Sequence, residues 1–174
     1  ASGVSHQCGL REGGEAWCWG ANESGQLGDG TTEDRAEARR VATETSFTSL
    51  VGGLSHTCGL DGRGSAYCWG RNVGGQLGDG TRTDRSLPGP VSGGSTFERL
   101  AAGWNHTCGQ ASGGRTLCWG LNGEGQLGDG TRVDRLVPTR VPGSFRGLVA
   151  GAAHTCGISG EETYCWGDNG FGQL

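Results

Sequence analysis

Eight cysteines and four histidines recur along the chain at regular intervals, and their side chains could form disulfides, bind a metal ion or transfer protons. The histidines lie 50, 50 and 48 residues apart, at His6, His56, His106 and His154. Two positions after each histidine comes one cysteine, and nine or ten residues later comes a second. The resulting pairs are Cys8 and Cys18, Cys58 and Cys68, Cys108 and Cys118, and Cys156 and Cys165. A tryptophan directly follows each second cysteine, at Trp19, Trp69, Trp119 and Trp166.

The spacing within each cysteine pair favours a disulfide. If the pair lies on the two strands of an antiparallel hairpin, Cys58 opposite Cys68 leaves a turn of ordinary length, and so does Cys156 opposite Cys165. Directly opposed residues have Cα atoms about 4.5–5.5 Å apart, which is within reach of an S–S bond. The same register places Tyr67 across from Gly59, where an aromatic ring can cover the exposed backbone.

Two other states of the cysteines remain open from the sequence. His56, Cys58 and Cys68 offer three ligands to a metal ion, although the repeat shows no fourth ligand and lacks the short cysteine knuckle of zinc sites. The cysteines could also be free structural thiols. We expect disulfides, with no metal and no cofactor. Because disulfides persist in oxidising compartments, we expect an extracellular, periplasmic or cell-surface protein.

The four histidines are the candidates for proton transfer near neutral pH. They recur at the same place in every repeat, whereas a catalytic residue is usually unique. We therefore expect structural histidines, hydrogen-bonded to the backbone between neighbouring repeats. The sequence presents no Ser–His–Asp arrangement, phosphate-binding loop or lone cysteine nucleophile. We expect a protein that has no catalytic residues and is not an enzyme.

A Gly-Asp-Gly-Thr loop follows three of the cysteine pairs, with its aspartates at Asp29, Asp79 and Asp129. An Asp-Gly dipeptide suits turns that need a positive φ, and threonine can add a local hydrogen bond. Calcium binding would use Asp79, Thr81 and Asp84, but this loop has fewer oxygen ligands than calcium loops do. We expect a structural turn instead, in which Arg85 pairs with the loop carboxylates.

The composition excludes two classes of partner. The net charge is −4, all 14 basic residues are arginine, and these arginines are scattered, so a surface that follows a phosphate backbone is not expected. The apolar runs are only a few residues long, so insertion into a membrane is not expected either. Arginine without lysine, together with abundant glycine and alanine, is typical of proteins from GC-rich bacterial genomes.

The elements that must position these residues are short strands. In the repeat from Phe97 to Val141, apolar and turn residues predict four strands and a long glycine-rich loop, with Pro138 favouring an edge strand. Four short strands in about fifty residues predict an all-β propeller of four-stranded antiparallel blades, in one domain over residues 1–174. The repeats cover residues 1–45, 46–95, 96–143 and 144–174, and the first and last are incomplete.

The repeated strings are similar to those of a known family. The order Gly-x-x-His-Thr-Cys-Gly-Leu, Tyr-Cys-Trp-Gly-x-Asn, Gly-Gln-Leu-Gly-Asp-Gly-Thr and Asp-Arg-x-x-Pro-x-x-Val resembles the regulator of chromosome condensation repeat family. The resemblance implies a seven-bladed propeller, of which about 3.5 repeats are present here, either as a fragment or as half of a ring that two chains complete. The cysteine pairs depart from the nuclear members and indicate a secreted, bacterial-like type.

Binding is the function that these observations favour. We expect an extracellular, non-enzymatic module that binds another protein or a surface glycan, and the residues expected to make contact are Trp104, Arg71 and Phe171. For Trp104 the sequence leaves open an alternative role, in which it packs between neighbouring blades. The family resemblance implies one alternative, a guanine nucleotide exchange factor for a small GTPase. Another alternative is the structural subunit of a self-assembling surface fibre. Two glycosylation sequons begin at Asn22 and Asn105.

Overall fold

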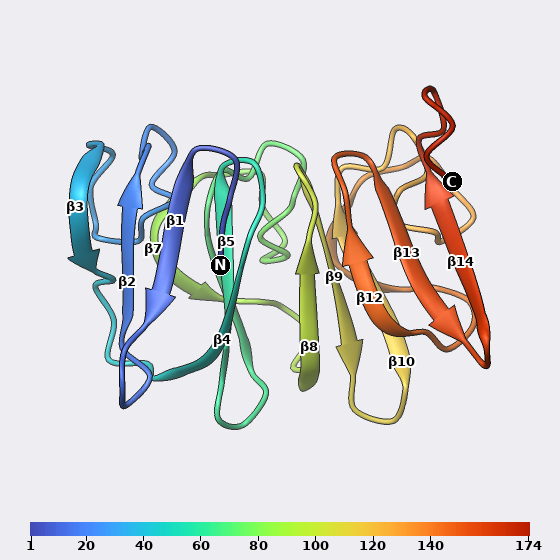
Figure 1. Cartoon of the computed structure of the whole chain (residues 1–174), viewed down its shortest axis with the longest axis horizontal. Coiled ribbons are helices and arrows are strands. Elements are labelled where there is room, and N and C mark those ends of the chain that lie inside the picture. The colour runs from blue at the N-terminus through green and yellow to red at the C-terminus, as the bar shows by residue number, and fades with distance from the viewer.

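The computed structural model describes residues 1–174 and consists of fourteen β-strands in four antiparallel sheets that follow one another along the molecule (Figure 1). Sheet 1 contains β1 (His6–Leu10), β2 (Ala16–Gly20) and β3 (Arg35–Arg40). Sheet 2 contains β4 (Phe47–Gly52), β5 (His56–Asp61), β6 (Ala66–Gly70) and β7 (Arg85–Pro90). Sheet 3 contains β8 (Phe97–Ala102), β9 (His106–Ala111), β10 (Arg115–Gly120) and β11 (Arg135–Arg140). Sheet 4 contains β12 (Arg146–Ala150), β13 (His154–Ser159) and β14 (Glu162–Gly167).

The strands lie in each sheet in the order of the chain, as in a propeller blade, so the predicted all-β class is confirmed. Pro138 lies on β11, an edge strand of sheet 3, where its missing N–H leaves no gap in the ladder. Sheets 1 and 4 have three strands because the first repeat lacks its first strand and the last repeat lacks its fourth. No helix that could cross a membrane is present.

The predicted hairpin register is confirmed. Cys58 lies opposite Cys68, Thr57 opposite Trp69 and Gly59 opposite Tyr67. One detail of the prediction is wrong, because Tyr67 is not the ring that fills the space over Gly59. A Cβ atom on Gly59 would lie 2.7 Å from the ring of Phe47, which reaches over from the neighbouring strand β4. Tyr67 instead packs edge-on against Phe47, with ring centroids 6.1 Å apart.

The apolar core is divided into three clusters, each between two successive sheets. In every cluster a cysteine pair and a leucine of one sheet meet a phenylalanine and a tryptophan of the next. The ring centroids of these aromatic pairs are 5.7 Å apart for Phe47 and Trp69 and 4.9 Å apart for Phe145 and Trp166. A single sheet therefore buries its face only against its neighbours, as the repeat pattern requires.

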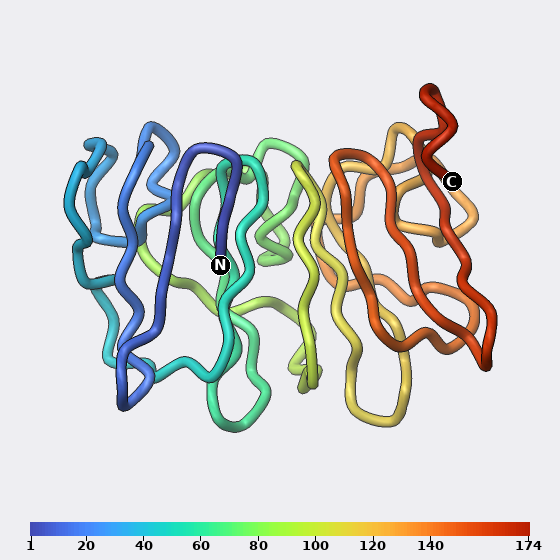
Figure 2. The backbone as a smooth tube through the Cα atoms, viewed as in Figure 1, coloured from blue at the N-terminus to red at the C-terminus, as the bar shows by residue number.

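The loops are divided between two ends of the sheets (Figure 2). The short hairpins within each cysteine pair lie at one end. The connections from the first to the second strand, and the long glycine-rich connections from the third to the fourth strand, lie at the other end, which we call the loop face. Antiparallel strands in chain order produce this alternation, so both complete repeats present the same two kinds of loop there.

The number of sheets differs from the number of repeats. Each incomplete repeat forms a sheet of its own, so the 3.5 repeats make four sheets. Two copies of the chain would therefore bring eight sheets together, one more than the seven that simple doubling of the repeats implies. Self-association that completes a ring remains a prediction.

Candidate functional site

All eight cysteines form disulfides in the predicted pairs, and the Cα atoms within each pair are 4.1 Å apart. The pairs of sheets 1 to 3 are buried against the following sheet. Because the sulfurs are bonded to each other, they provide no thiolates, and the ligand set of His56, Cys58 and Cys68 is not available to a metal. The alternative of free thiols is also wrong for this structure. Four disulfides are typical of proteins from oxidising compartments.

The histidines of sheets 1 to 3 connect each sheet to the next. Nε2 of His56 lies 2.9 Å from Oγ1 of Thr107 in sheet 3. Thr107 donates its hydroxyl proton to the main-chain oxygen of Gln76, and the Nε1 hydrogen of Trp119 is donated to that same oxygen. The equivalent contacts recur from sheet 1 to sheet 2 and from sheet 3 to sheet 4. These three histidines bridge repeats as predicted, but the predicted backbone partner is wrong, since each of the three rings bonds to a threonine hydroxyl. The fourth, His154 in the last sheet, makes no such bond.

These contacts determine the protonation state of the rings. Thr107 has one hydroxyl proton and donates it to Gln76, so Nε2 of His56 must carry the hydrogen of the shared bond. Nδ1 of His56 is then an unprotonated nitrogen without a partner, packed against Gly53. Burial, with a smaller contribution from neighbouring histidines, lowers the pKa of His56 from 6.5 to about 3 and that of His106 to about 4. The rings are thus neutral hydrogen-bond donors between sheets.

The tryptophans after the second cysteine fill the spaces between sheets. Trp69 and Trp119 are fully buried, whereas Trp19 and Trp166, in the terminal sheets, are half-buried. Gly78 of the preceding sheet lies against the indole of Trp119 with a φ of +68°, and a Cβ atom there would be 2.7 Å from Nε1. This close approach explains why a glycine follows Gln-Leu in each long loop.

Each long loop folds around a buried asparagine. Oδ1 of Asn72 accepts the main-chain N–H of Leu77, and its Nδ2 donates to Asp79 and to the main-chain oxygen of Thr81. Asn22 and Asn122 make the same contacts in their own loops. From its sequon alone, Asn22 is expected only as a glycosylation acceptor, but its amide is fully buried and bonded within the loop. The signal for this role is the Trp-Gly-x-Asn string present in all four repeats.

The aspartates of the Gly-Asp-Gly-Thr loops pair with arginines, as predicted. The N···O distances are 2.9 Å for Arg35 and Asp29, 3.3 Å for Arg85 and Asp79, and 2.7 Å for Arg135 and Asp129. Burial by itself would raise the pKa of Asp129, but hydrogen bonds from Thr131, Arg135 and Asn122 outweigh it and lower that pKa to about 2. The oxygens considered for calcium are thus engaged in the internal hydrogen bonds of the loop.

The residues that differ between repeats are placed differently from these constant ones. The constant asparagine, glutamine and leucine of each complete long loop are buried. The variable residues lie on the loop face at two places in each repeat. The first place is two residues before the repeated histidine, and the second is directly after Trp-Gly. The first position holds Val4, Leu54, Trp104 and Ala152, and the second holds Ala21, Arg71, Leu121 and Asp168.

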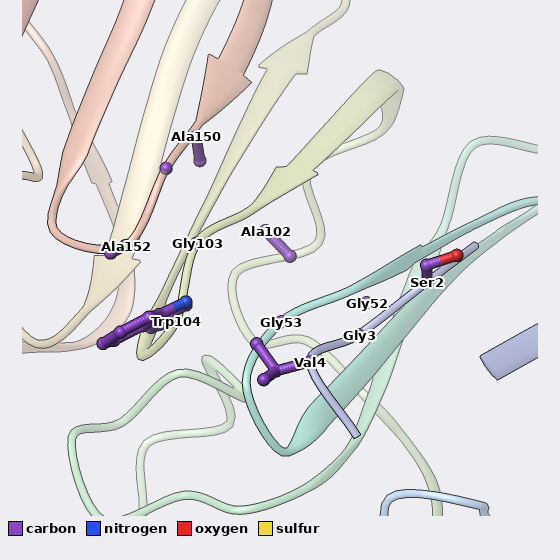
Figure 3. Close-up of a pocket in the computed structure, with 11 residues that line it drawn as sticks. Ser2, Gly3, Val4, Gly52, Gly53, Ala102, Gly103, Trp104, Ala150 and Ala152 are labelled. Carbon is purple, nitrogen blue, oxygen red and sulfur yellow. The ribbon is translucent and has the colours of Figure 1, made fainter. Parts of the chain in front are cut away.

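Trp104 and Val4 border a shallow hollow of about 280 Å³ on the loop face (Figure 3). The Trp104 side chain is 49% exposed and that of Val4 is 61% exposed. Glycines and alanines of the four sheets form most of the lining, and Ser2 contributes its only polar side chain. Main-chain hydrogen bonds hold the rim together, because Trp104 donates to Ala152 and accepts from Leu54. An exposed tryptophan beside a hollow can offer a partner a large, rigid apolar contact and one N–H donor.

The other residues expected to make contact are also exposed, but they do not all lie together. Arg71 follows Trp-Gly in sheet 2, and its main-chain N–H donates to the Ser55 oxygen of the neighbouring loop on this face. Phe171 is 95% exposed near the last residue and lies outside the hollow. Asn105, the other sequon asparagine, accepts a hydrogen bond from the Gln76 side chain.

Comparison with known proteins identifies the repeat. The model of the regulator of chromosome condensation (RCC1) repeat matches residues 13–60, 63–109 and 113–158, and a second RCC1 repeat model matches residues 47–76 and 97–126. These boundaries begin within the cysteine hairpins, so each matched unit spans parts of two sheets. A search of curated proteins gave no match.

Solved structures share the fold. Human WBSCR16 is 22% identical over 95% of this chain and 45% of its own, with a TM-score of 0.84. Yeast RCC1 (Prp20), solved bound to Kap60, is 20% identical over 97% of this chain and 43% of its own, with a TM-score of 0.85. The ectodomain of the Physcomitrella patens receptor kinase CR4 is 26% identical over 96% of this chain and 38% of its own, with a TM-score of 0.65. The chain thus spans less than half the length of each of these proteins.

Proposed function

The chain belongs to the regulator of chromosome condensation (RCC1) repeat family, and from that premise we propose that it is an exported, non-enzymatic propeller module that binds another protein through its loop face. The observation behind this proposal is the difference in burial between the constant and the variable residues of each repeat. Constant residues are buried and build the scaffold, whereas the variable residues of the loop face are half-buried or exposed, with Val4, Arg71 and Trp104 among the exposed ones. Variable loops on a rigid scaffold are the usual place for recognition.

Two further observations support export. The four disulfides would not persist against the reducing thiol pool of the cytosol or nucleus. The CRINKLY ectodomain of the Arabidopsis thaliana receptor kinase ACR4 matches 96% of this chain at 25% identity, with a TM-score of 0.64. A repeat array of this kind is therefore compatible with the outside of a cell.

The alternatives have less support. A nuclear exchange factor would work among reduced thiols, and the likeness to yeast RCC1 at 20% identity concerns the fold alone. A self-assembling fibre would need a sheet edge that pairs readily. The edge strand β3 reads Arg-Ala-Glu-Ala-Arg-Arg, and its charged side chains oppose edge-to-edge pairing there, so a fibre would have to use another edge, such as β14 of the last sheet.

The proposal can be tested by panning a phage-displayed library of random peptides on the oxidised chain. Enriched clones are then measured against Trp104→Ala and against Leu10→Ala, a matched loss of a partly exposed apolar side chain on β1. We expect clones that bind the Leu10→Ala variant normally and bind Trp104→Ala about thirtyfold more weakly, as for an interface hot spot. Clones that bind the Trp104→Ala variant as tightly as the original chain, or no enrichment at all, would contradict binding through this face.

A further inference from the structure

We infer that the loop face recognises a protein segment in which an acidic side chain lies close to a large apolar one. The apolar side chain would pack between Trp104 and Val4, and the carboxylate would pair with Arg71. This inference rests on the proposed function and adds the chemistry of the partner to it.

The hollow itself selects an apolar group. Its lining has no charged side chain, and the two large side chains on its rim, Trp104 and Val4, are apolar. The floor consists of glycines such as Gly53 and Gly103, whose main-chain N–H groups are already bonded to the bridging histidines of their own loops. A sugar could stack on Trp104, but the only side-chain partners for its hydroxyls would be Ser2 and the indole N–H of Trp104. An aliphatic or aromatic side chain of a protein suits this surface better than a glycan.

Arg71 provides the charge beside the hollow. The arginines that follow the long loops, such as Arg85, bond to loop aspartates, and Arg82 bonds to Asp134 of the next sheet. The Arg71 side chain, in contrast, is exposed and forms neither an ion pair nor a hydrogen bond within the chain. A free guanidinium on a recognition surface favours a carboxylate, which it can hold through two parallel hydrogen bonds.

The distance between Arg71 and Trp104 is short enough for nearby residues of one peptide to contact both. Arg71 is hydrogen-bonded to Ser55, and the adjacent Leu54 is hydrogen-bonded to Trp104, so two chain-to-chain steps separate Arg71 from Trp104. At about 4.8 Å for each step, the separation is roughly 10 Å. An extended peptide advances about 3.3 Å for each residue, so an acidic residue one to three positions from the apolar anchor reaches the guanidinium.

The orientation of the bound segment follows from the negative charge of Asp168, which belongs to sheet 4 on the opposite side of the hollow from sheet 2. Sheet 4 places Asp168 at the position that Arg71 occupies in sheet 2. The Asp168 carboxylate accepts hydrogen bonds from the Gly170 N–H and from the Gln173 side chain. A second acidic group would meet this negative charge, so the carboxylate of the partner should point toward sheet 2.

The test uses the peptides enriched on the oxidised chain, and it compares Arg71→Glu with Arg63→Glu. Arg63 is an exposed arginine without an ion pair in the hairpin at the opposite end of sheet 2, so it is a matched control for charge reversal. We expect the enriched peptides to carry Asp or Glu within three residues of an aromatic or aliphatic side chain. Arg71→Glu should weaken their binding about tenfold and Arg63→Glu should not.

A charge swap makes the test specific. Replacing the acidic residue of a peptide by lysine should abolish binding to the original chain and restore it to the Arg71→Glu variant. Peptides that depend on Trp104 but carry no acid and ignore Arg71→Glu would overturn this inference while leaving the proposed function intact. Peptides whose binding changes neither with Trp104→Ala nor with Arg71→Glu would overturn both proposals.

Discussion

Mild acid should destabilise the protein, because a proton taken up by any of three buried histidines would go to an Nδ1 atom that has no hydrogen-bond partner and would leave a buried, unpaired charge. Burial lowers the folded-state pKa to about 4 for His6, about 3 for His56 and about 4 for His106, whereas an unfolded histidine titrates near 6.5. The unfolded chain therefore binds more protons below pH 6.5. The stability that these rings provide is complete above that value and falls as the pH drops toward 4.

The size of this loss in the free energy of unfolding follows from the difference in proton binding between the folded and unfolded states. Between pH 7 and pH 5 each ring loses about 2 kcal/mol of its contribution, so the free energy of unfolding should fall by about 5–6 kcal/mol for the three. The loss at pH 5 depends mainly on the unfolded pKa, because all three folded values lie lower. The pKa of Asp129 is lowered to about 2, so its contribution is lost only at more acidic pH and does not confuse the result.

Urea unfolding of the oxidised chain at pH 7 and pH 5, followed by tryptophan fluorescence, measures this loss. The variant His56→Gln provides the control, since an amide can still donate to the Thr107 hydroxyl but does not titrate. It should lower the stability at pH 7 and reduce the loss on acidification by about 2 kcal/mol. Equal free energies of unfolding at the two pH values would refute the neutral, buried state of these rings.

Three further substitutions test the scaffold by the same unfolding measurement. Replacing both Cys58 and Cys68 by alanine should cost about 2.5–3 kcal/mol through the lost constraint on the unfolded chain, and an unchanged midpoint would contradict this. Asn72→Ala should cost about 3–5 kcal/mol, because it leaves the bonded groups of its loop without partners, and a cost below about 1 kcal/mol would rule out that role. Gly53→Ala should destabilise strongly, since its Cβ would lie 2.2 Å from the histidine ring, whereas Gly62→Ala meets nothing within 4 Å and should be nearly neutral.

The sequence was sufficient to predict the contacts within a sheet. A strand places alternate side chains on opposite faces, so the cysteine spacing alone indicated that Cys58 lies opposite Cys68 and that Gly59 lies opposite Tyr67. The arginine that pairs with each loop aspartate was also predictable, because Asp79 and Arg85 are close in sequence.

Contacts between sheets were harder to predict, because they join residues about fifty positions apart. The bond from His56 to Thr107 depends on how two sheets pack, and no pattern within one strand shows it. The role of Asn72 depends on the conformation of a loop with little regular structure, in which a side chain replaces main-chain partners. At the loop face, the exposed position of Trp104 could be anticipated, but the hollow beside it needs four sheets at once.

The central claim is that this repeat array is a disulfide-linked, exported scaffold for binding. The redox state of the eight cysteines in the protein as its own cells produce it tests this claim most directly. The protein is denatured in an alkylating reagent, and its intact mass is measured with and without prior reduction. With four disulfides, we expect no alkylation before reduction and a mass about 8 Da below that of the all-thiol chain, two hydrogens for each disulfide. Eight alkylated thiols without reduction would contradict export and favour an intracellular role such as nucleotide exchange.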